Sequence, residues 1–231
     1  MYAFKLFFAS GLQVSAPSNL RSLITSRRDV ISSADVLGRL VDIMLGVLFF
    51  FLTLPILAIA AIAVKLENPA TGVFFRQTRF GYHGRPFTIL KLRTMIPEAE
   101  KLKSELIALS PDKGPGFKIP DDPRVTPIGR LLRRFYVDEI PQILIVLKGD
   151  MSIVGPRANS YRPETYEPWQ RIRLIVKPGL TGTWQIARNK PVSFEDRCRM
   201  DLDYVTRKSV YLDISIVMNT VVMMLTRANG S

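Results

Sequence analysis

The sequence has little of the chemistry on which many enzymes depend. It holds one cysteine, Cys198, and one histidine, His83, among 231 residues. No disulfide can form within the chain, which suits a reducing compartment. A zinc site of histidine and cysteine ligands is excluded, and a nucleophile activated by histidine would have to use His83. If the chain is an enzyme, we expect carboxylates or lysine to do the covalent work, with oxygen-ligated Mg²⁺ as the metal.

Acidic residues are also few. Lysine and arginine together number 32 against 20 for aspartate and glutamate, which gives a formal net charge of +12. Such an excess indicates an anionic partner, which could be nucleic acid, an anionic membrane surface or a phosphorylated substrate. We find no recognisable nucleic-acid-binding motif, so we expect no nucleic-acid partner.

Charge is missing altogether from one long apolar run, Ile43 to Val64. The run is long enough to span a hydrocarbon core of about 30 Å as a straight helix. Pro55 inside it removes a backbone hydrogen bond, and basic residues flank the run on both sides. We therefore predict a re-entrant helix over 34–66 that breaks at Pro55, with the Thr53 hydroxyl as a partner for the freed backbone groups. A plain spanning helix is the alternative.

The other segments divide the chain further. Residues 1–33 are predicted to form a basic flexible arm, 67–210 a cytosolic catalytic domain, and 211–231 an amphipathic C-terminal helix. This last helix could lie in the core or in the membrane interface. The fold class that we predict is α+β and mostly helical, a small catalytic body on a proline-broken membrane helix with amphipathic interfacial helices.

Within the predicted catalytic domain, local patterns indicate a few elements. "VFFRQTRF" and "PFTILKLRT" predict a β-hairpin joined by "GYHGR". We predict a helix over 97–109 and a mobile loop in the proline-rich stretch 110–123. Thr126 followed by Pro127 predicts the start of another helix, and "SFED" at 193–196 predicts a capping box.

The strongest candidate for chemistry is the pair Asp138 and Glu139. Asp138 would suit a helix N-cap and Glu139 a first turn, so we predict a helix that begins at Asp138. A carboxylate at such a position among arginines stays ionised and can also act as a nucleophile or a metal ligand. The basic residues close to the pair, or in neighbouring motifs, are Lys91, Arg93, Arg130, Arg133, Arg134 and Arg157. Arginine matches phosphate oxygens bidentately, so the set predicts a pyrophosphate site completed by Mg²⁺.

Six motifs resemble those of a known family. In order, they are "FRQTRFGYHGRPF", "KLRTM", "DPRVTPIGRLLRR", "DEIPQ", "LKGDMSIVGPR" and "KPGLTGTWQ". Behind one proline-broken membrane helix, they resemble the bacterial sugar transferase family, the monotopic phosphoglycosyl transferases, over residues 34–230. The resemblance implies transfer of sugar-1-phosphate from a UDP-sugar to undecaprenyl phosphate, with release of UMP. It also implies that this transfer is the first membrane step of exopolysaccharide or glycan assembly.

The resemblance carries roles for particular residues. It implies that Asp138 attacks the β-phosphorus and forms a covalent sugar-phosphoryl-aspartate, and that Asp138 and Glu139 hold Mg²⁺. It implies that Pro55 turns the membrane helix back. The basic residues that it implies for phosphate binding are Lys91, Arg93, Arg133 and Arg157.

The expected location is the bacterial inner (cytoplasmic) membrane, with the active site facing the cytoplasm. Anionic lipid is an expected partner, and a homo-oligomer is possible.

Four positions depart from the usual family pattern, Leu54, Ile145, Ala158 and Ala187. They lie outside the acid pair, so they leave the reaction class intact and the sugar open. Two alternatives stay open. One is a glycosyltransferase that moves only the sugar and releases UDP; the other is a basic, membrane-anchored lipid-binding or scaffold protein without catalysis.

Overall fold

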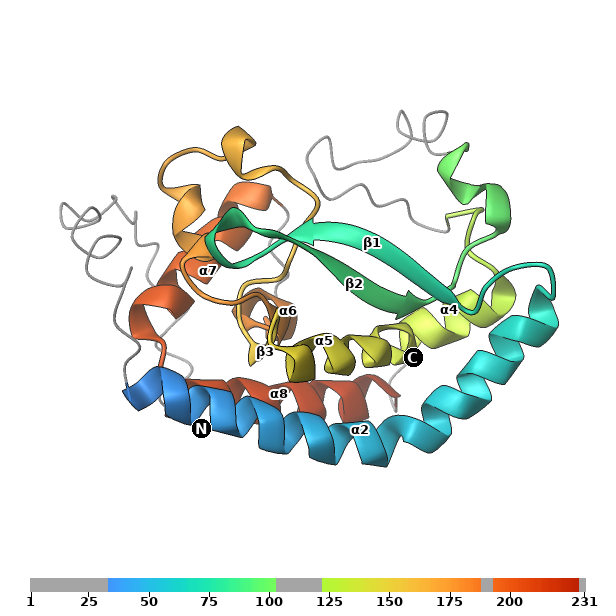
Figure 1. The fold of residues 1–231 in the computed structure, drawn as a ribbon, viewed down its shortest axis with the longest axis horizontal. Helices are drawn as coiled ribbons and strands as arrows, with labels where there is room; N and C mark the ends of the chain where they lie inside the picture. The colour runs from blue at the N-terminus through green and yellow to red at the C-terminus, as the bar shows by residue number, and fades with distance from the viewer. Residues whose placement is uncertain (1–32, 103–121, 188–192, 229–231) are drawn as a thin grey trace. The chain divides into compact units, whose positions relative to one another are not determined.

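The computed structural model describes residues 33–102, 122–187 and 193–228. The predicted arm over 1–33 and the predicted loop over 110–123 lie almost wholly outside these ranges. The described part is mostly helical with short strands, as predicted. Its α-helices are α2 (Ser33–Glu67), α4 (Pro127–Arg134), α5 (Ile143–Lys148), α6 (Thr183–Ile186), α7 (Phe194–Arg207) and α8 (Val210–Ala228). Its strands are β1 (Phe74–Phe80), β2 (Pro86–Leu92), β3 (Ser152–Val154) and β4 (Gly179–Thr181) (Figure 1). Its 3₁₀ helices are η1 (Tyr82–Gly84), η2 (Pro97–Glu100), η4 (Val137–Gln142), η5 (Pro163–Thr165) and η6 (Gln170–Leu174).

Two small sheets form the β part. Strands β1 and β2 are antiparallel, with Phe74 opposite Leu92 and Phe80 opposite Pro86, which confirms the predicted hairpin. Strands β3 and β4 are parallel and join two segments that are far apart in the chain. Of the helix predicted over 97–109, the structure describes residues to 102 and shows a 3₁₀ turn at η2.

Helix α2 continues through Pro55, so the structure shows one helix where we predicted two segments separated by a break. The helix bends along its length (Figure 1). Pro55 has no N–H for the carbonyl of Phe51, four residues earlier. The Thr53 hydroxyl donates to the carbonyl of Phe49 at 2.6 Å. It therefore does not bond to the Phe51 carbonyl that Pro55 leaves free, contrary to our prediction. Such a bond to the preceding turn favours bending. The re-entrant course stays a prediction.

One side of α2 packs against the rest of the described fold. Near its start, Arg39 donates to the carbonyls of Val146 and Leu147 at the end of α5, both at 2.7 Å. Asp42 is buried and accepts from the Ser152 hydroxyl and from the backbone N–H of Ile153 in β3. These contacts place the N-terminal half of α2 directly beneath the strand that leads to the site.

The C-terminal half of α2 meets the predicted start of α4. The Thr126 hydroxyl accepts from the N–H of Gly129, which confirms it as the N-cap. The Glu67 carboxylate at the end of α2 accepts from the N–H of Ile128. A small core lies between these elements; its buried members are Ala60, Val64, Leu92 and Leu132. Helix α4, which carries the arginines that precede the acid pair, is thereby fixed to α2.

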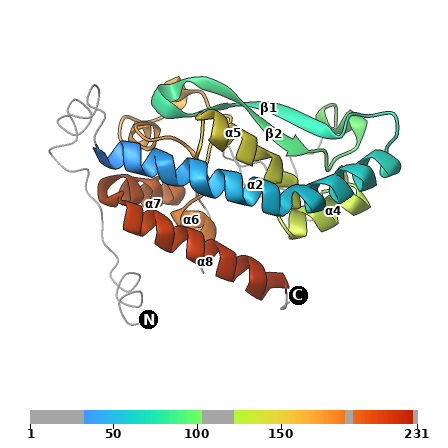
Figure 2. The ribbon, with the colours of Figure 1, turned by 60° about the horizontal axis from the view of Figure 1, so that its bottom comes forward.

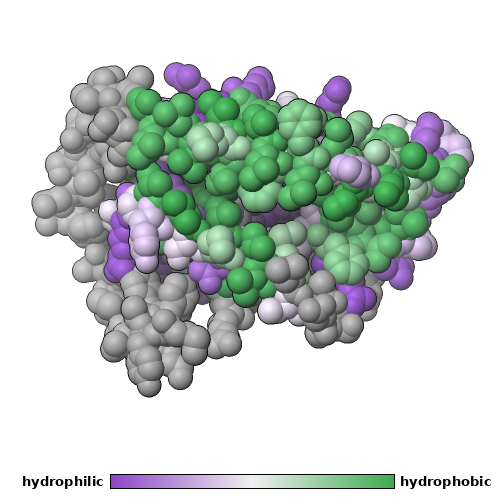
Figure 3. Space-filling model, turned by 90° about the horizontal axis from the view of Figure 1, so that it is seen from below, coloured by the Kyte–Doolittle hydropathy of each residue, from purple (hydrophilic) through white to green (hydrophobic). Residues whose placement is uncertain are grey.

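The other side of α2 is apolar and exposed. Within the described ranges, this is the one helix (Asp35–Glu67) long and apolar enough to cross a membrane. Its most exposed apolar side chains are Met44, Phe51, Leu52, Ile59, Ile62 and Leu66. Helix α8 runs beside α2 (Figures 1 and 2), and the two present a broad apolar surface (Figure 3).

Helix α8 has two different faces. On the inner face, Ile216 is buried, Thr220 hydrogen-bonds with Thr181 at 2.8 Å, and Asp213 accepts from the Tyr204 hydroxyl at 2.7 Å. The outer face leaves Tyr211 and Met218 exposed. One face of the helix is therefore part of the core and the other is exposed and apolar; its place in the membrane interface stays a prediction.

Candidate active site

A left-handed residue sets the local geometry of the acid pair. Tyr136 has φ 58° and ψ 18°, and it ends α4 and starts the 3₁₀ helix η4. Asp138 and Glu139 therefore lie inside a 3₁₀ helix, and neither caps it through a side chain. The predicted N-cap at Asp138 was wrong, because the tight turn at Tyr136 displaces the helix start. In a 3₁₀ helix, residues three apart lie on one face, which puts Gln142 in line with Glu139.

Glu139 is bound by two cations. Its Oε1 accepts from the Lys91 ammonium at 2.6 Å, and both Nη atoms of Arg157 donate to the carboxylate, Nη1 to Oε2 at 3.1 Å. Lys91 comes from β2, and Arg157 follows β3. Burial alone would raise the pKa of Glu139, but Arg157 and Lys91 together hold it far below its usual range. Glu139 is therefore a permanently ionised anchor for both cations.

Asp138 is held more loosely than its neighbour. Its side chain is buried, with the residue 6% exposed, and its closest ion-pair partner in the described part of the chain is Lys91, with Nζ 4.0 Å from Oδ2. Burial raises the pKa of Asp138, and the attraction of Lys91 only partly opposes this effect. An ionised carboxylate that is buried and incompletely neutralised is poised to react with an electrophile or to take a cation.

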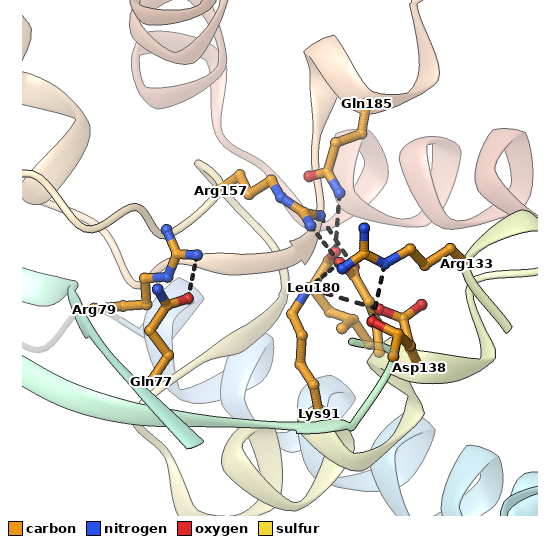
Figure 4. A network of polar contacts seen from close by, with 10 residues as sticks. Gln77, Arg79, Lys91, Arg133, Asp138, Arg157, Leu180 and Gln185 are labelled. Carbon is orange, nitrogen blue, oxygen red and sulfur yellow. Dashed lines mark hydrogen bonds and ion pairs between the residues drawn. The ribbon is translucent and has the colours of Figure 1, made fainter. Parts of the chain in front are cut away.

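The arginines implied by the resemblance divide into two groups. Figure 4 shows Arg157 and Arg133 entering from opposite sides, with Asp138 below Arg133 and Lys91 reaching up from β2. Arg133 donates through Nε to the Thr94 hydroxyl at 2.9 Å, which leaves the rest of its guanidinium for another anion. Arg93 donates to the carbonyls of Gly72 and Phe74 instead. In the part that the structure describes, the Arg93 side chain is thus hydrogen-bonded to backbone carbonyls at the start of β1 and makes no ion pair with Asp138 or Glu139.

A small, open pocket adjoins the cations that bind Glu139; its lining includes Lys91, Arg157 and two residues to which the sequence assigned no role. These are Arg79 of β1 and Gln142 of η4. Arg79 Nε and Gln142 Nε2 are buried and lack a hydrogen-bond partner among the described residues. Burial and the nearby charge of Arg157 lower the pKa of Arg79. Arg79 lies in the motif "FRQTRFGYHGRPF" and Gln142 in "DEIPQ". The only sequence feature that could have indicated a role was the spacing of three residues between Glu139 and Gln142.

Two glycine motifs build the backbone that carries Arg157. A side chain on Gly155 would come within 2.4 Å of the Lys177 carbonyl, and one on Gly179 within 2.0 Å of the Gly155 nitrogen. The N–H of Gly179 donates to the carbonyl of Pro156, and that of Gly155 to the carbonyl of Thr181. "VGPR" and "KPGLTG" are therefore two halves of one close-packed backbone framework.

The donor set fits a magnesium site of limited size. No group of three or more histidine, cysteine, aspartate or glutamate side chains that could hold a metal occurs within the described ranges. Mg²⁺ is commonly held by one or two carboxylates together with substrate phosphates. Asp138 could supply one such carboxylate, since its side chain is buried and its nearest ion-pair partner in the described part of the chain is 4.0 Å away; both oxygens of Glu139 already accept from Lys91 and Arg157.

The buried acid pair, the two cations bound to Glu139 and the adjoining pocket are features that suit an anionic ligand. The sequence profile of the family described as bacterial sugar transferase matches residues 33–227. The chain belongs to this family and is a transferase.

Several relatives with similar sequences are also named as sugar transferases. EpsL of Bacillus subtilis, an uncharacterized sugar transferase, is 39% identical over 190 residues, 80% of this chain and 86% of that protein. The UDP-glucose:undecaprenyl-phosphate glucose-1-phosphate transferase of Caulobacter vibrioides is 38% identical over 207 residues, 86% of this chain and 73% of that protein. The galactosyl transferase CpsE of Streptococcus agalactiae is 36% identical over 196 residues, 83% of this chain. The chain spans 41% of CpsE, so that relative is much longer.

Proposed function

We propose that this protein transfers sugar-1-phosphate from a UDP-sugar to a polyprenyl phosphate, of which undecaprenyl phosphate is the form named for its relatives, and releases UMP. The observation that carries the proposal is the unequal treatment of the two acids. Glu139 is neutralised by Lys91 and Arg157, whereas the buried Asp138 has its nearest ion-pair partner among the described residues, Lys91 Nζ, at 4.0 Å. Such an arrangement suits one anchor and one nucleophile.

In the first step, a carboxylate oxygen of Asp138 attacks the β-phosphorus of the donor. The bond from that phosphorus to the bridging oxygen breaks, and UMP leaves with the electron pair. In the second step, a phosphate oxygen of the lipid attacks the same phosphorus, the bond from that phosphorus to the Asp138 oxygen breaks, and Asp138 leaves with the electron pair as a carboxylate. One phosphoanhydride is exchanged for another, so little net free energy is required.

The remaining side chains bind and orient. Arg157 and Lys91 face the diphosphate while anchored on Glu139, and the guanidinium of Arg133 is available to it as well. The idle donors of Arg79 and Gln142 line the same pocket and suit phosphate oxygens. Mg²⁺ would be held by Asp138 and Glu139 and would supply charge neutralisation for the diphosphate. We assign no phosphate role to Arg93.

The proposed location is the bacterial inner (cytoplasmic) membrane, with the site facing the cytoplasm. The apolar surface of α2 and α8 would contact lipid, and the excess of basic residues would favour anionic headgroups. We propose exopolysaccharide or glycan assembly as the pathway because relatives include the exopolysaccharide production protein ExoY of Rhizobium meliloti, 34% identical over 185 residues.

The test uses the full chain in nanodiscs with undecaprenyl phosphate, Mg²⁺ and a panel of UDP-sugars. We expect UMP release with one or a few donors, loss of release on addition of EDTA, and no release by Asp138→Asn. With donor but no lipid, intact-protein mass spectrometry should show a sugar-phosphate adduct on the wild type and none on the variant. Release of UDP in place of UMP would overturn the proposal and favour plain glycosyl transfer.

A further inference from the structure

Behind the site, on the side away from the acids, lies a buried ion pair that the proposed chemistry does not use. Arg173 of η6 and Asp201 of α7 approach to 2.9 Å between Nη2 and Oδ2, and their side chains are 5% and 1% exposed. The same Nη2 atom donates to the backbone carbonyl of Arg157 at 2.7 Å. The guanidinium of Arg157 in turn binds the Glu139 carboxylate.

We propose that Arg173 and Asp201 are positioning residues that hold the backbone of Arg157 and so aim its guanidinium at Glu139. This inference rests on the proposed function, since it presumes that the Arg157–Glu139 contact serves the reaction. The ion pair touches neither the acids nor the pocket beside them, so it acts through Arg157.

The surroundings of Arg173 support a fixed position. Its guanidinium carbon lies 5.6 Å from the centre of the Phe194 ring, and Phe194 stacks on Tyr166. The Arg157 carbonyl therefore meets a donor that is held by a carboxylate on one side and an aromatic ring on another. Arg157 also bridges to Gly179, so its backbone is fixed at both edges.

The Arg173–Asp201 ion pair is better suited to positioning than to stabilising the fold. Burying an ion pair contributes little net stability compared with apolar side chains of the same volume. Burial raises the pKa of Asp201 to about 6, even with the opposing attraction of Arg173. The pair is thus a poor device for stability, whereas the Nη2 atom of Arg173 lies against both the Asp201 carboxylate and the Arg157 carbonyl and can fix the position of that carbonyl.

The experiment compares Arg173→Lys with Arg124→Lys. Arg124 is the matched control because it is also buried, pairs with Asp122 at 2.7 Å and donates to a backbone carbonyl, that of Ala99 at 3.1 Å. Each substitution keeps the charge and removes the planar fork. Steady-state UMP release gives kcat and KM for each variant, and thermal unfolding gives Tm.

We expect Arg173→Lys to lower kcat about 10- to 100-fold with little change in KM for the donor, because a shift on the order of 1 Å in a positioned group has that effect. We expect Arg124→Lys to keep kcat within about 3-fold at a similar loss of Tm. Equal kcat values for the two lysine variants would overturn the proposal. If Arg173→Lys does not fold, Asp201→Asn replaces it, with the same direction expected.

A double variant separates positioning from general damage. Arg173→Lys combined with Arg157→Lys should lose no more activity than Arg157→Lys alone, because Arg173 acts only through Arg157. Losses that multiply would overturn the inference. If the wild type releases UDP in place of UMP, the proposed function fails. If the wild type releases UMP and either Arg157→Lys keeps the wild-type rate or Arg173→Lys matches its control, only the positioning inference fails.

Discussion

The two adjacent acids should respond in opposite ways when each loses its charge. Glu139→Gln removes the carboxylate that neutralises Lys91 and Arg157 and leaves two cations without it in a largely buried site. Breaking a buried pair in this way costs about 3–5 kcal/mol. For a domain of this size, 1 kcal/mol corresponds to about 2–4 °C in Tm, so we expect a loss of roughly 6–20 °C.

Asp138→Asn should not show this loss. The pKa of Asp138 is raised in the folded state, so at pH 7 the ionised carboxylate is less favourable in the folded protein than in the unfolded chain. The amide has nearly the same shape and carries no charge, which removes this cost. We therefore expect a Tm equal to or above that of the wild type, even though the variant is inactive.

The assay is thermal unfolding of wild type and both variants in the same nanodiscs at pH 7, with UMP release measured on the same samples. We expect both variants to lose activity and only Glu139→Gln to lose stability. The reasoning would be refuted by a Tm for Glu139→Gln within about 2 °C of wild type, or by an equal fall in Asp138→Asn. The first result would mean that the cations are not anchored on Glu139, and the second that the charge of Asp138 stabilises the fold.

Three further predictions follow from individual contacts. Arg93→Ala should keep UMP release within about 3-fold of wild type, because Arg93 binds backbone carbonyls beside β1; a loss of the size seen in Arg157→Lys would contradict this placement. Burial raises the pKa of Asp201 to about 6, so the native state keeps a proton that the unfolded state has lost, and wild-type Tm relative to Asp201→Asn should fall as pH rises from 4 to 6. A pH-independent difference between the two would contradict it. Gly129→Ala should lower Tm because its Cβ would lie 2.2 Å from the Thr94 carbonyl oxygen, whereas Gly38→Ala, with nothing within 4 Å, should not; equal Tm values would show that α4 can move away from Thr94.

The elements that were predictable depend on neighbours in the chain. The Thr126 cap, the Ser193 cap and the β-hairpin were all confirmed, since each is decided by side chains and turn residues within a few positions. The start of η4 was not predictable in the same way. A left-handed conformation at Tyr136, which is neither glycine nor asparagine, has no local signature and is held by its surroundings.

The sequence by itself determined the family, the apolar helix, and most of the residues that meet at the site. It left open how those residues divide the work. Lys91 and Glu139 stand 48 positions apart, and Arg157 stands 18 from Glu139, so only packing decides that the two cations bind Glu139 more closely than Asp138. Burial, which sets the pKa of Asp138 and leaves Arg79 and Gln142 with idle donors, likewise exists only in the folded chain. Local sequence encodes which groups are present, and the tertiary structure decides their distances and their access to water, on which their electrostatics depend.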